Sequence, residues 1–372
     1  MALKDEVLAA LERVQSPDGT PLSKTGALSE VVVSDGKVFF SISVDAGVVN
    51  AWEPVRKRAE QAVRAVPGVQ SAMIALTAER KAAAGARPAP AAPAAARSPR
   101  GETTQGVPGV EAIIAVASGK GGVGKSTTAV NLALGLASLG LKVGVLDADI
   151  YGPSLPKLLA IKERPQTIGG TRLKPITRYG LTVMSIGFLI DEETPMIWRG
   201  PMVISALTQM LREVEWGKLD VMVVDMPPGT GDAQLTMAQQ VPLKGAVIVS
   251  TPQDLALIDA RRGIAMFKRV NVPVLGIIEN MSYFLCPNCG TRSDVFSHGG
   301  ARHEAERLGV PFLGEVPLHM TIREKSDAGL PVVASEPDGA LAAVYRDIAA
   351  KIRDQLKGGT AGRAAPRIVI EA

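Results

Sequence analysis

The sequence has few cysteines, few aromatic residues and no long apolar run. Only 2 of its 372 residues are cysteine, and 4% are aromatic. Two neighbouring cysteines cannot build the disulfide framework of a small secreted domain, so we expect metal or redox chemistry from the pair. No apolar run reaches the roughly 20 residues that cross a bilayer, and the charged, amphipathic N-terminus is unlike a signal peptide. We therefore predict a cytoplasmic protein without a membrane partner.

A strongly charged surface is also absent. The formal net charge is +4, and the segment 79–102 contributes +3 of it through five basic and two acidic residues. The rest of the chain is nearly neutral, so no charged face predicts binding to nucleic acid. The basic segment is typical of a solubilised linker.

The length predicts two or three domains. Residues 1–80 have the order helix, strand, strand, helix, strand, with a hairpin signal at 34–36. Residues 81–109 are rich in Ala and Pro and have too few large apolar side chains to fold, so we predict a disordered linker. The main domain would span 110–357, followed by a flexible tail at 358–372.

Short apolar runs alternate with helical patterns in the main domain. Runs that are apolar at nearly every position are typical of strands buried on both faces. We therefore predict the α/β class: a mostly parallel sheet with helices on both faces, preceded by the small α/β domain. The runs are 112–117, 143–146, 181–186, 221–224, 246–249 and 274–278.

A glycine-rich loop follows the first run and precedes a helical pattern. It reads G-x-x-x-x-G-K-S and ends in Lys125 and Ser126. Its backbone N–H groups can converge on phosphate oxygens, because glycines avoid Cβ clashes, and the helix N-terminus adds positive potential. Lys125 should contact the β- and γ-phosphates and Ser126 should bind Mg²⁺. The loop predicts ATP binding by Gly119, Lys120, Gly121, Gly122, Val123, Gly124, Lys125, Ser126 and Thr127.

Acidic residues end two other predicted strands. Asp147 and Asp149 follow one run, and Asp225 follows another within Asp-Met-Pro-Pro-Gly. Carboxylates at the C-terminal ends of parallel strands lie at the edge where such sheets bind ligands. Hydrolysis needs a held Mg²⁺ and an oriented water, so these acids are candidates for both tasks.

The loop carries a second lysine, Lys120, near its start. The pattern Lys-Gly-Gly-x-Gly-Lys resembles the deviant Walker A loop of the MinD, ParA and nitrogenase iron-protein class. In that class the early lysine crosses a dimer interface to the partner's nucleotide. The resemblance therefore implies an ATP-sandwich homodimer in which Lys120 and Lys125 both act in catalysis. The alternative is a solvated lysine without such a role.

The same resemblance assigns roles to the other polar residues. It places Asp147 and Asp149 in the first switch and makes Asp149 the residue that orients the attacking water. Asp225 is the acid near Mg²⁺, and Gly229 presents its N–H to the γ-phosphate. Asn280, which follows another predicted strand, contacts the nucleotide base through its carboxamide. A turn-forming asparagine is the competing interpretation.

Cys286 and Cys289 form a C-x-x-C motif. Such a turn can direct both thiolates to one metal ion or cluster, but two thiolates do not complete a four-coordinate site. Three arrangements stay open: a redox dithiol, a zinc site that recruits His298 and His303, and a cluster shared by two chains at a twofold axis. The dimer implied by Lys120 favours the third.

Residues 111–355 closely resemble the Mrp/ApbC family of iron–sulfur cluster carriers. The family implies an ATPase that forms a homodimer, binds a 4Fe-4S cluster and transfers it to apoproteins. The motifs that carry the resemblance are the phosphate loop, Asp-Ala-Asp-Ile-Tyr-Gly-Pro-Ser from 147, Trp-Arg-Gly-Pro from 198, Asp-Met-Pro-Pro-Gly-Thr-Gly-Asp from 225, Glu-Asn-Met-Ser from 279, the cysteine pair and the run at 312–318.

Residues 1–80 resemble the small SufT/PaaD-like domain that many members carry. Such domains often have Cys-Pro before the second helix, whereas Glu53-Pro54 stands here. We therefore expect docking of apoproteins or assembly factors and not thiol chemistry from this domain. Two other functions remain: a zinc-stabilised ATPase without a cluster, and a MinD- or ParA-like positioning ATPase. The second usually needs an amphipathic helix or a basic surface, which 358–372 does not offer.

Overall fold

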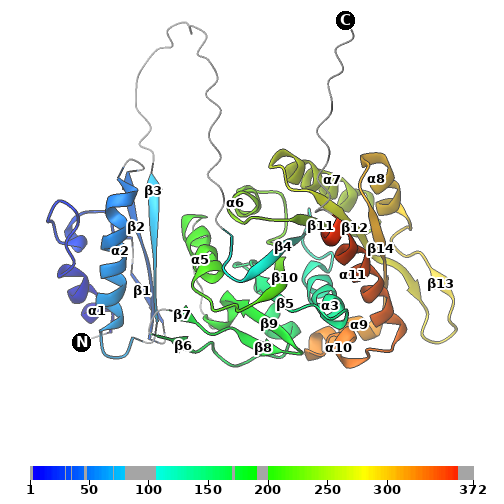
Figure 1. The fold of residues 1–372 in the computed structure, drawn as a ribbon, viewed down its shortest axis with the longest axis horizontal. Helices are drawn as coiled ribbons and strands as arrows, with labels where there is room; N and C mark the ends of the chain where they lie inside the picture. Colours follow the sequence, from blue (N-terminus) through cyan, green and yellow to red (C-terminus); the bar gives the residue numbers. More distant parts are fainter. Residues whose placement is uncertain are drawn as a thin grey trace, which may run out of the picture. The chain divides into compact units, whose positions relative to one another are not determined.

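The computed structural model describes residues 3–29, 31–34, 36–45, 48–69, 71–79, 106–169, 172–190 and 200–358. Most of the predicted linker and tail, and Trp198-Arg199, lie outside these ranges. The chain divides into two compact units, one of residues 1–103 with 193–209 and one of 104–192 with 210–372 (Figure 1). No helix in the described ranges has both the length and the apolarity that a bilayer requires. The domain boundaries drawn from the sequence stay predictions.

The N-terminal unit has the predicted order of elements. β1 pairs antiparallel with β2, and β3 pairs parallel with β2 after the crossover helix α2. A core of aliphatic side chains and Phe40 fills the space between the sheet and the two helices. The elements are α1 (Leu3–Glu12), the short 3₁₀ helix η1 (Leu22–Lys24), β1 (Val32–Ser34), β2 (Lys37–Asp45), α2 (Val49–Arg64) and β3 (Ser71–Glu79).

Helix α2 corrects one expectation. The sequence pattern predicts this helix from about Pro54 to Val66, but it begins five residues earlier, at Val49. The reason lies in its apolar face: Val49 and Trp52 pack against the same core as Val55. Burying these side chains extends the helix through the proline, although a proline lacks the N–H for a helical hydrogen bond.

The main unit is built on a nine-stranded sheet with the order β13-β12-β11-β4-β10-β5-β9-β8, in which β14 also pairs with β12. All neighbours are parallel except β8 and β13, which pair antiparallel. The strands are β4 (Val110–Ala117), β5 (Val143–Asp147), β8 (Ile176–Arg178), β9 (Leu181–Ser185), β10 (Leu219–Asp225), β11 (Gly245–Ser250), β12 (Val274–Leu285), β13 (Arg292–Ser293) and β14 (Phe312–Leu318); β6 (Thr167–Ile168) and β7 (Arg172–Leu173) form a separate hairpin.

Helices pack on both faces of this sheet. From β4 the chain adds strands in one direction along the sheet, toward β9, and later it adds strands in the opposite direction, toward β12 (Figure 1). Because both sets of crossovers are right-handed, α3 and α7 lie on opposite faces of the sheet. The helices of this unit are α3 (Lys125–Ser138), α4 (Leu155–Leu158), η2 (Ile186–Phe188), α6 (Asp232–Gln240), α7 (Asp254–Arg269), α8 (Gly300–Leu308), α9 (Met320–Ala328), α10 (Val332–Ser335) and α11 (Ala340–Gly358). Helix α5 (Gly200–Arg212) begins in the other unit and ends in this one.

The six predicted apolar runs are the six strands β4, β5, β9, β10, β11 and β12, so the predicted fold class is confirmed. No apolar run predicts β8, β13 or β14 as a strand. β14 contains Pro317, which a central strand does not tolerate, but β14 pairs only with β12 and therefore lies at an edge.

Strand register brings the predicted acids to one edge of the sheet. Asp225 of β10 pairs with Val116 of β4 on one side and with Asp147 of β5 on the other. Because all three strands are parallel, their C-terminal ends coincide. The loops that follow them therefore meet at one place, which becomes the candidate site.

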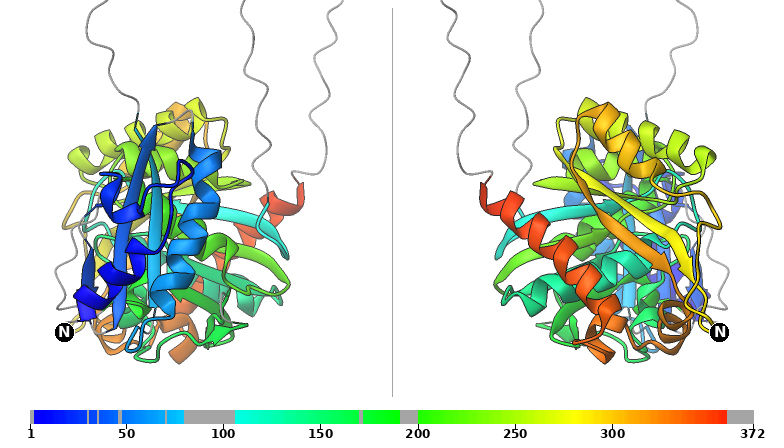
Figure 2. Two further views of the ribbon diagram at one scale, coloured as in Figure 1. Left: turned by 90° about the vertical axis from the view of Figure 1, so that its left-hand side faces the viewer. Right: turned by 90° about the vertical axis from the view of Figure 1, so that its right-hand side faces the viewer.

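Helix α3 is held close to α11, which lies beside it in the right-hand view of Figure 2. Gly135 of α3 faces the backbone of Tyr345 and the side chain of Ala349. A Cβ at Gly135 would lie 3.0 Å from the Cβ of Ala349 and 3.1 Å from the carbonyl oxygen of Tyr345. The absence of a side chain at Gly135 thus sets the position of the helix whose first residue is Lys125.

We expect Gly135→Leu to lower the free energy of unfolding by about 1–3 kcal/mol, because leucine overpacks the contact with α11. Leucine favours helix more than glycine does, so a loss cannot come from helix propensity. Ser138→Leu is the matched control, since Ser138 is exposed near the end of the same helix. Urea unfolding measures both variants; equal stabilities would contradict the close packing.

Candidate functional site

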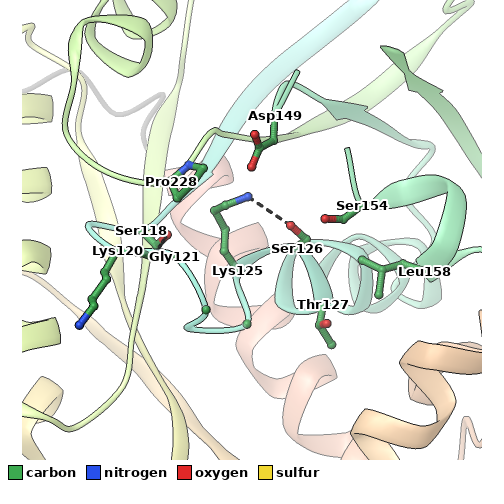
Figure 3. A pocket seen from close by; sticks show the side chains of 12 residues that line it. Ser118, Lys120, Gly121, Lys125, Ser126, Thr127, Asp149, Ser154, Leu158 and Pro228 are labelled. Carbon is green, nitrogen blue, oxygen red and sulfur yellow. Dashed lines mark hydrogen bonds between the residues drawn. The ribbon is translucent and has the colours of Figure 1, made fainter. Parts of the chain in front are cut away.

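A cavity of about 280 Å³ lies at the C-terminal edge of β4, β5 and β10 (Figure 3). It is bounded by the glycine-rich loop, by the segment after β5 and by the segment after β10. The lining residues are Ser118, Lys120, Gly121, Gly122, Gly124, Lys125, Ser126, Thr127, Asp149, Ser154, Leu158 and Pro228. The structure thus brings most of the predicted loop residues and Asp149 together around one space.

The glycines of the loop are required for two different reasons. Gly122 and Gly124 have φ of +80° and +78°, a left-handed conformation that other residues adopt at a cost. At Gly119 the constraint is space, because a Cβ there would lie 2.2 Å from the carbonyl carbon of Asp259 on α7. A Cβ at Gly124 would also lie 2.2 Å from Nδ2 of Asn280. The loop is therefore enclosed by α7 and β12.

Lys125 and Asp225 form a buried ion pair beneath the loop. Nζ of Lys125 lies 2.6 Å from Oδ1 of Asp225 and donates to Oγ of Ser126 at 3.2 Å. The two side chains are 7% and 0% exposed. Burial raises the pKa of Asp225, and the charge of Lys125 acts in the opposite direction. The lysine thus lies where two segments of the site meet.

The donor set beside this pair fits Mg²⁺. Oδ2 of Asp225 is buried without a hydrogen-bond partner in the part of the chain that the structure describes. The hydroxyl of Ser126 is close enough to lower the pKa of Asp225. A carboxylate oxygen and a hydroxyl are the hard oxygen ligands that Mg²⁺ takes from proteins, usually only one or two per site.

Asp147 is buried and saturated with hydrogen bonds. Its Oδ2 accepts from the backbone N–H of Ser154 at 2.9 Å, from that of Leu155 at 3.1 Å and from the hydroxyl of Ser185 at 3.0 Å. Its Oδ1 accepts from the N–H of Asp149 at 3.2 Å. Burial and the nearby charge of Asp225 raise the pKa of Asp147 to about 7. Asp147 does not line the cavity; it holds the segment that places Asp149 and Ser154 there.

Asp149 lies on the opposite side of the cavity from the glycine-rich loop, with its carboxylate toward the amine of Lys125 (Figure 3). It is 9% exposed. Burial raises its pKa, and the charge of Lys125 acts against this. Asp149 is therefore the predicted acid with direct access to the cavity.

The segment after β10 is joined to the glycine-rich loop. The N–H of Gly229 donates to the carbonyl oxygen of Ser118 at 3.0 Å, and the hydroxyl of Ser118 donates to the carbonyl oxygen of Lys120 at 2.9 Å. Gly229 has φ of +96° and does not line the cavity, whereas the preceding Pro228 does. The predicted contact of Gly229 with a phosphate would replace its bond to Ser118.

Lys120 is exposed, and its side chain extends away from Lys125 and Asp149 (Figure 3). Asn280 is 8% exposed and donates from Nδ2 to the carbonyl oxygen of Val123 at 2.7 Å. It lies inside β12 and not in a turn, so the competing turn interpretation was wrong. Contact of Asn280 with a nucleotide base stays a prediction.

The cysteine pair lies in the connection between β12 and β13. The N–H of Cys286 donates to the carbonyl oxygen of Thr291 at 3.0 Å, and the N–H of Gly290 donates to that of Cys286 at 2.9 Å. Sγ of Cys289 lies 3.2 Å from the hydroxyl of Thr291, which lowers the pKa of this thiol. Cys286 is half-buried, Cys289 is exposed, and both are free thiols.

The zinc and dithiol interpretations of the pair lose their structural basis. Nε2 of His298 lies 3.1 Å from Oε2 of Glu315. Within the described ranges, no three His, Cys, Asp or Glu side chains converge as a metal site requires. The motif also connects two strands, whereas a thioredoxin-like dithiol opens a helix.

Sequence reasoning missed several residues that build the site. Ser185 ends β9 beside Asp147, and the rule for C-terminal strand ends could have identified it. Ser118 directly precedes the recognised loop, and Ser154 is the last residue of the recognised motif that starts at Asp147, but neither was assigned a role. Glu279 belongs to the recognised motif Glu-Asn-Met-Ser, but nothing in the sequence shows that it accepts from backbone N–H groups of Gly299 and Ala301, about 20 residues away.

Comparison with known proteins places the chain in a family. Residues 109–353 match the family model of the NUBPL iron-transfer P-loop NTPases, and residues 4–75 match that of an iron-sulfur cluster assembly protein. The iron-sulfur cluster transfer protein NUBPL of Dictyostelium discoideum is 55% identical over 243 residues, which is 65% of this chain and 75% of that protein. The iron-sulfur cluster carrier protein of Escherichia coli K12 is 55% identical over 241 residues, 64% of this chain and 65% of the carrier.

Solved structures agree on the nucleotide-binding fold. The nucleotide-binding protein of Archaeoglobus fulgidus, in complex with ADP, is 39% identical with a TM-score of 0.55 over 62% of this chain and 90% of that one. The cell division ATPase MinD of Pyrococcus furiosus shares the fold at 22% identity and a TM-score of 0.51, over 66% of this chain and 99% of that one. The recognised resemblance is confirmed, and the chain belongs to the family of NUBPL iron-transfer P-loop NTPases.

Proposed function

We propose that the chain is an ATP-hydrolysing iron–sulfur carrier that holds a 4Fe-4S cluster between two copies of itself and transfers it to apoproteins. The observation that carries the proposal is the convergence of Lys125, Ser126 and Asp149 on one cavity, in a chain of an iron-transfer family. Asp225 is paired to Lys125 beneath this cavity. The names of the transfer and carrier relatives support the cargo.

ATP binding would reorganise the ion pair beneath the loop. To reach the β- and γ-phosphates, the amine of Lys125 must turn from Asp225 toward the cavity. Asp225 then has two carboxylate oxygens, of which Oδ2 already lacks a partner in the described residues, for Mg²⁺ beside Ser126. Bound Mg²⁺ neutralises charge on the phosphate oxygens. Asp149, which lines the cavity, would orient the attacking water.

The third phosphate would be sensed by the segment after β10. Gly229 donates to Ser118 at the start of the glycine-rich loop. A γ-phosphate that accepts from Gly229 breaks this bond, and loss of the phosphate restores it. Hydrolysis would thereby change the contact between two segments that both border the cavity.

We expect Asp149→Asn to retain ATP binding and to lower the rate of phosphate release about 100-fold or more, the range for removing a group that handles the nucleophile's proton. Lys125→Ala should abolish binding itself. Asp354→Asn is the control, because Asp354 is an exposed residue of α11. Fluorescent-nucleotide titration and a phosphate-release assay measure the two steps; a fully active Asp149→Asn would contradict the assigned role.

Lys120 would act on the nucleotide of a second chain. It is exposed and extends away from its own Lys125 and Asp149 (Figure 3), whereas the loop on which it lies borders the cavity. The ammonium group of a Lys120 from the second chain would stabilise the negative charge on the phosphates only when the dimer is formed. Hydrolysis would therefore depend on dimerisation. A homodimer is therefore part of the proposed function.

We expect Lys120→Ala and Lys125→Ala to be inactive alone and to restore hydrolysis when mixed. The Lys120→Ala chain binds ATP but lacks the lysine for its partner, and the Lys125→Ala chain supplies that lysine without binding ATP. The phosphate-release rate of the mixture, at constant total chain concentration, is the measurement. A mixture no faster than the two proteins alone would contradict action between chains.

The cluster is the cargo of the proposed carrier. Cys286 and Cys289 lie close to the protein surface, and two copies of the pair supply the four thiolates of a 4Fe-4S cluster. The Thr291 hydroxyl that lowers the pKa of Cys289 favours the thiolate, which is the form that binds iron. The N-terminal unit would dock apoproteins or assembly factors, and a cytoplasmic location stays a prediction from the sequence.

We expect Cys286→Ala and Cys289→Ala each to abolish the broad visible absorption that develops when iron and sulfide are added anaerobically. His298→Ala and His303→Ala should keep it, because the histidines take no part in a cluster shared by four thiolates. Metal analysis of purified protein separates the alternatives: four iron and four sulfide per dimer support the cluster. One zinc per chain, lost in the histidine variants, would overturn it.

A further inference from the structure

Strand β12 connects the glycine-rich loop directly to the cysteine pair. Asn280, near the middle of the strand, contacts the loop at Val123. The strand ends at Leu285, and Cys286 is the next residue. Five residues therefore separate a contact with the nucleotide site from the first thiol, along one continuous strand.

The contact between loop and strand is close and buried. Nδ2 of Asn280 donates to the carbonyl oxygen of Val123 at 2.7 Å, and Asn280 is 8% exposed. The neighbouring Gly124 has no room for even a methyl group against the same nitrogen. Asn280 is thus hydrogen-bonded to Val123 and packed against Gly124. Because of these two contacts, a displacement of either residue must move Asn280.

Glu279, the residue before Asn280, holds the segment 282–299, which contains both cysteines. Glu279 is fully buried, and its Oε1 accepts from the hydroxyl of Ser282 at 2.6 Å and from the N–H of Gly299 at 2.9 Å. Its Oε2 accepts from the N–H of Ala301 at 2.7 Å, at the start of α8. One carboxylate on β12 thus ties the beginning of the segment 282–299 to its end, and both cysteines lie within this segment.

The strand also has a place where it can bend. Between Asn280 and Phe284 the register of β12 against β14 shifts. Met281 has φ of +55°, the left-handed conformation that is uncommon for a residue with a side chain. The ladder is therefore interrupted just after Asn280, and a shift there can re-aim the rest of the strand and the cysteines beyond it.

We propose that Asn280 is a positioning residue: through β12 and Glu279 it transmits the nucleotide state of the loop to Cys286 and Cys289. Nucleotide phosphates bind the backbone N–H groups of the loop and move the Val123 carbonyl, and Asn280 follows. Glu279 moves with it and carries both ends of the cysteine segment. The proposal rests on the proposed function, because it needs ATP at the loop and iron–sulfur binding at the thiols.

Coupling between two sites is reciprocal. If nucleotide changes the state of the thiols, then occupancy of the thiols changes nucleotide affinity by the same factor. The Asn280–Val123 bond is the contact through which both effects pass. Removing this bond should abolish the effect of each site on the other, even when both sites are occupied.

The test measures the alkylation rate of Cys286 and Cys289 by iodoacetamide in the full chain, without nucleotide, with Mg-ADP and with a non-hydrolysable Mg-ATP analogue. In the wild type we expect the rate to change about fivefold or more between nucleotide states, the lower end of common coupling between sites. Asn280→Ala and Asn280→Asp, each at nucleotide concentrations that saturate it by direct titration, should show the same rate in all states. Asp keeps the shape of Asn but cannot donate to Val123.

Tyr283→Phe is the matched control, because Tyr283 lies on the same strand three residues after Asn280 and the change removes only its hydroxyl. It should keep the full nucleotide response. A response retained in both Asn280 variants would overturn the proposal, as would a wild type whose nucleotide affinity is equal with and without a loaded cluster. A wild type that binds no nucleotide, or no cluster, would instead refute the proposed function, so the two failures are distinguishable.

Discussion

The buried ion pair of Lys125 and Asp225 is the interaction on which the nucleotide site depends. Strand register places Asp225 beside Asp147, and Asp149 follows two residues later, so three largely buried carboxylates share one lysine. Removing one partner of such a pair costs about 3–5 kcal/mol, because the other charge stays buried alone. Burial raises the pKa of all three acids. Burial thus opposes negative charge on these acids, and the charge of Lys125 acts against that effect. Under the proposed function, Mg²⁺ would take over this role at Asp225 when the lysine turns toward phosphate.

The conformation of the glycine-rich loop is imposed by its neighbours as much as by its own glycines. Gly119 is pressed against α7, and Gly124 against Asn280 of β12. Ser118 accepts from Gly229 of the segment after β10. A loop held by three elements cannot adjust to a ligand alone. A ligand that displaces the loop must therefore also displace the residues that contact it on α7, on β12 and in the segment after β10.

The sequence predicted the parts of this structure whose signals are local. Uninterrupted apolar runs identified six strands because strands buried on both faces need no polar residues, and the loop motif identified its own site. The features that could not be predicted depend on contacts between distant segments. Nothing near Asp147 shows that four donors saturate it. Nothing near Asn280 shows that its partner is 157 residues away. The early start of α2 was missed because a proline signal outweighed the apolar face formed by Val49 and Trp52.

Under the proposed function, the position of the cysteines follows from the task of a carrier. A buried site with four ligands from one chain would hold a cluster too firmly and hide it from a recipient. Here each chain offers two thiols on the segment between β12 and β13, with Cys289 exposed. Under the proposed function, cluster retention then depends on keeping two chains together, and the nucleotide controls that association. A segment tied at both ends to Glu279 can shift as a unit, so the cluster can be presented without unfolding the domain that holds ATP.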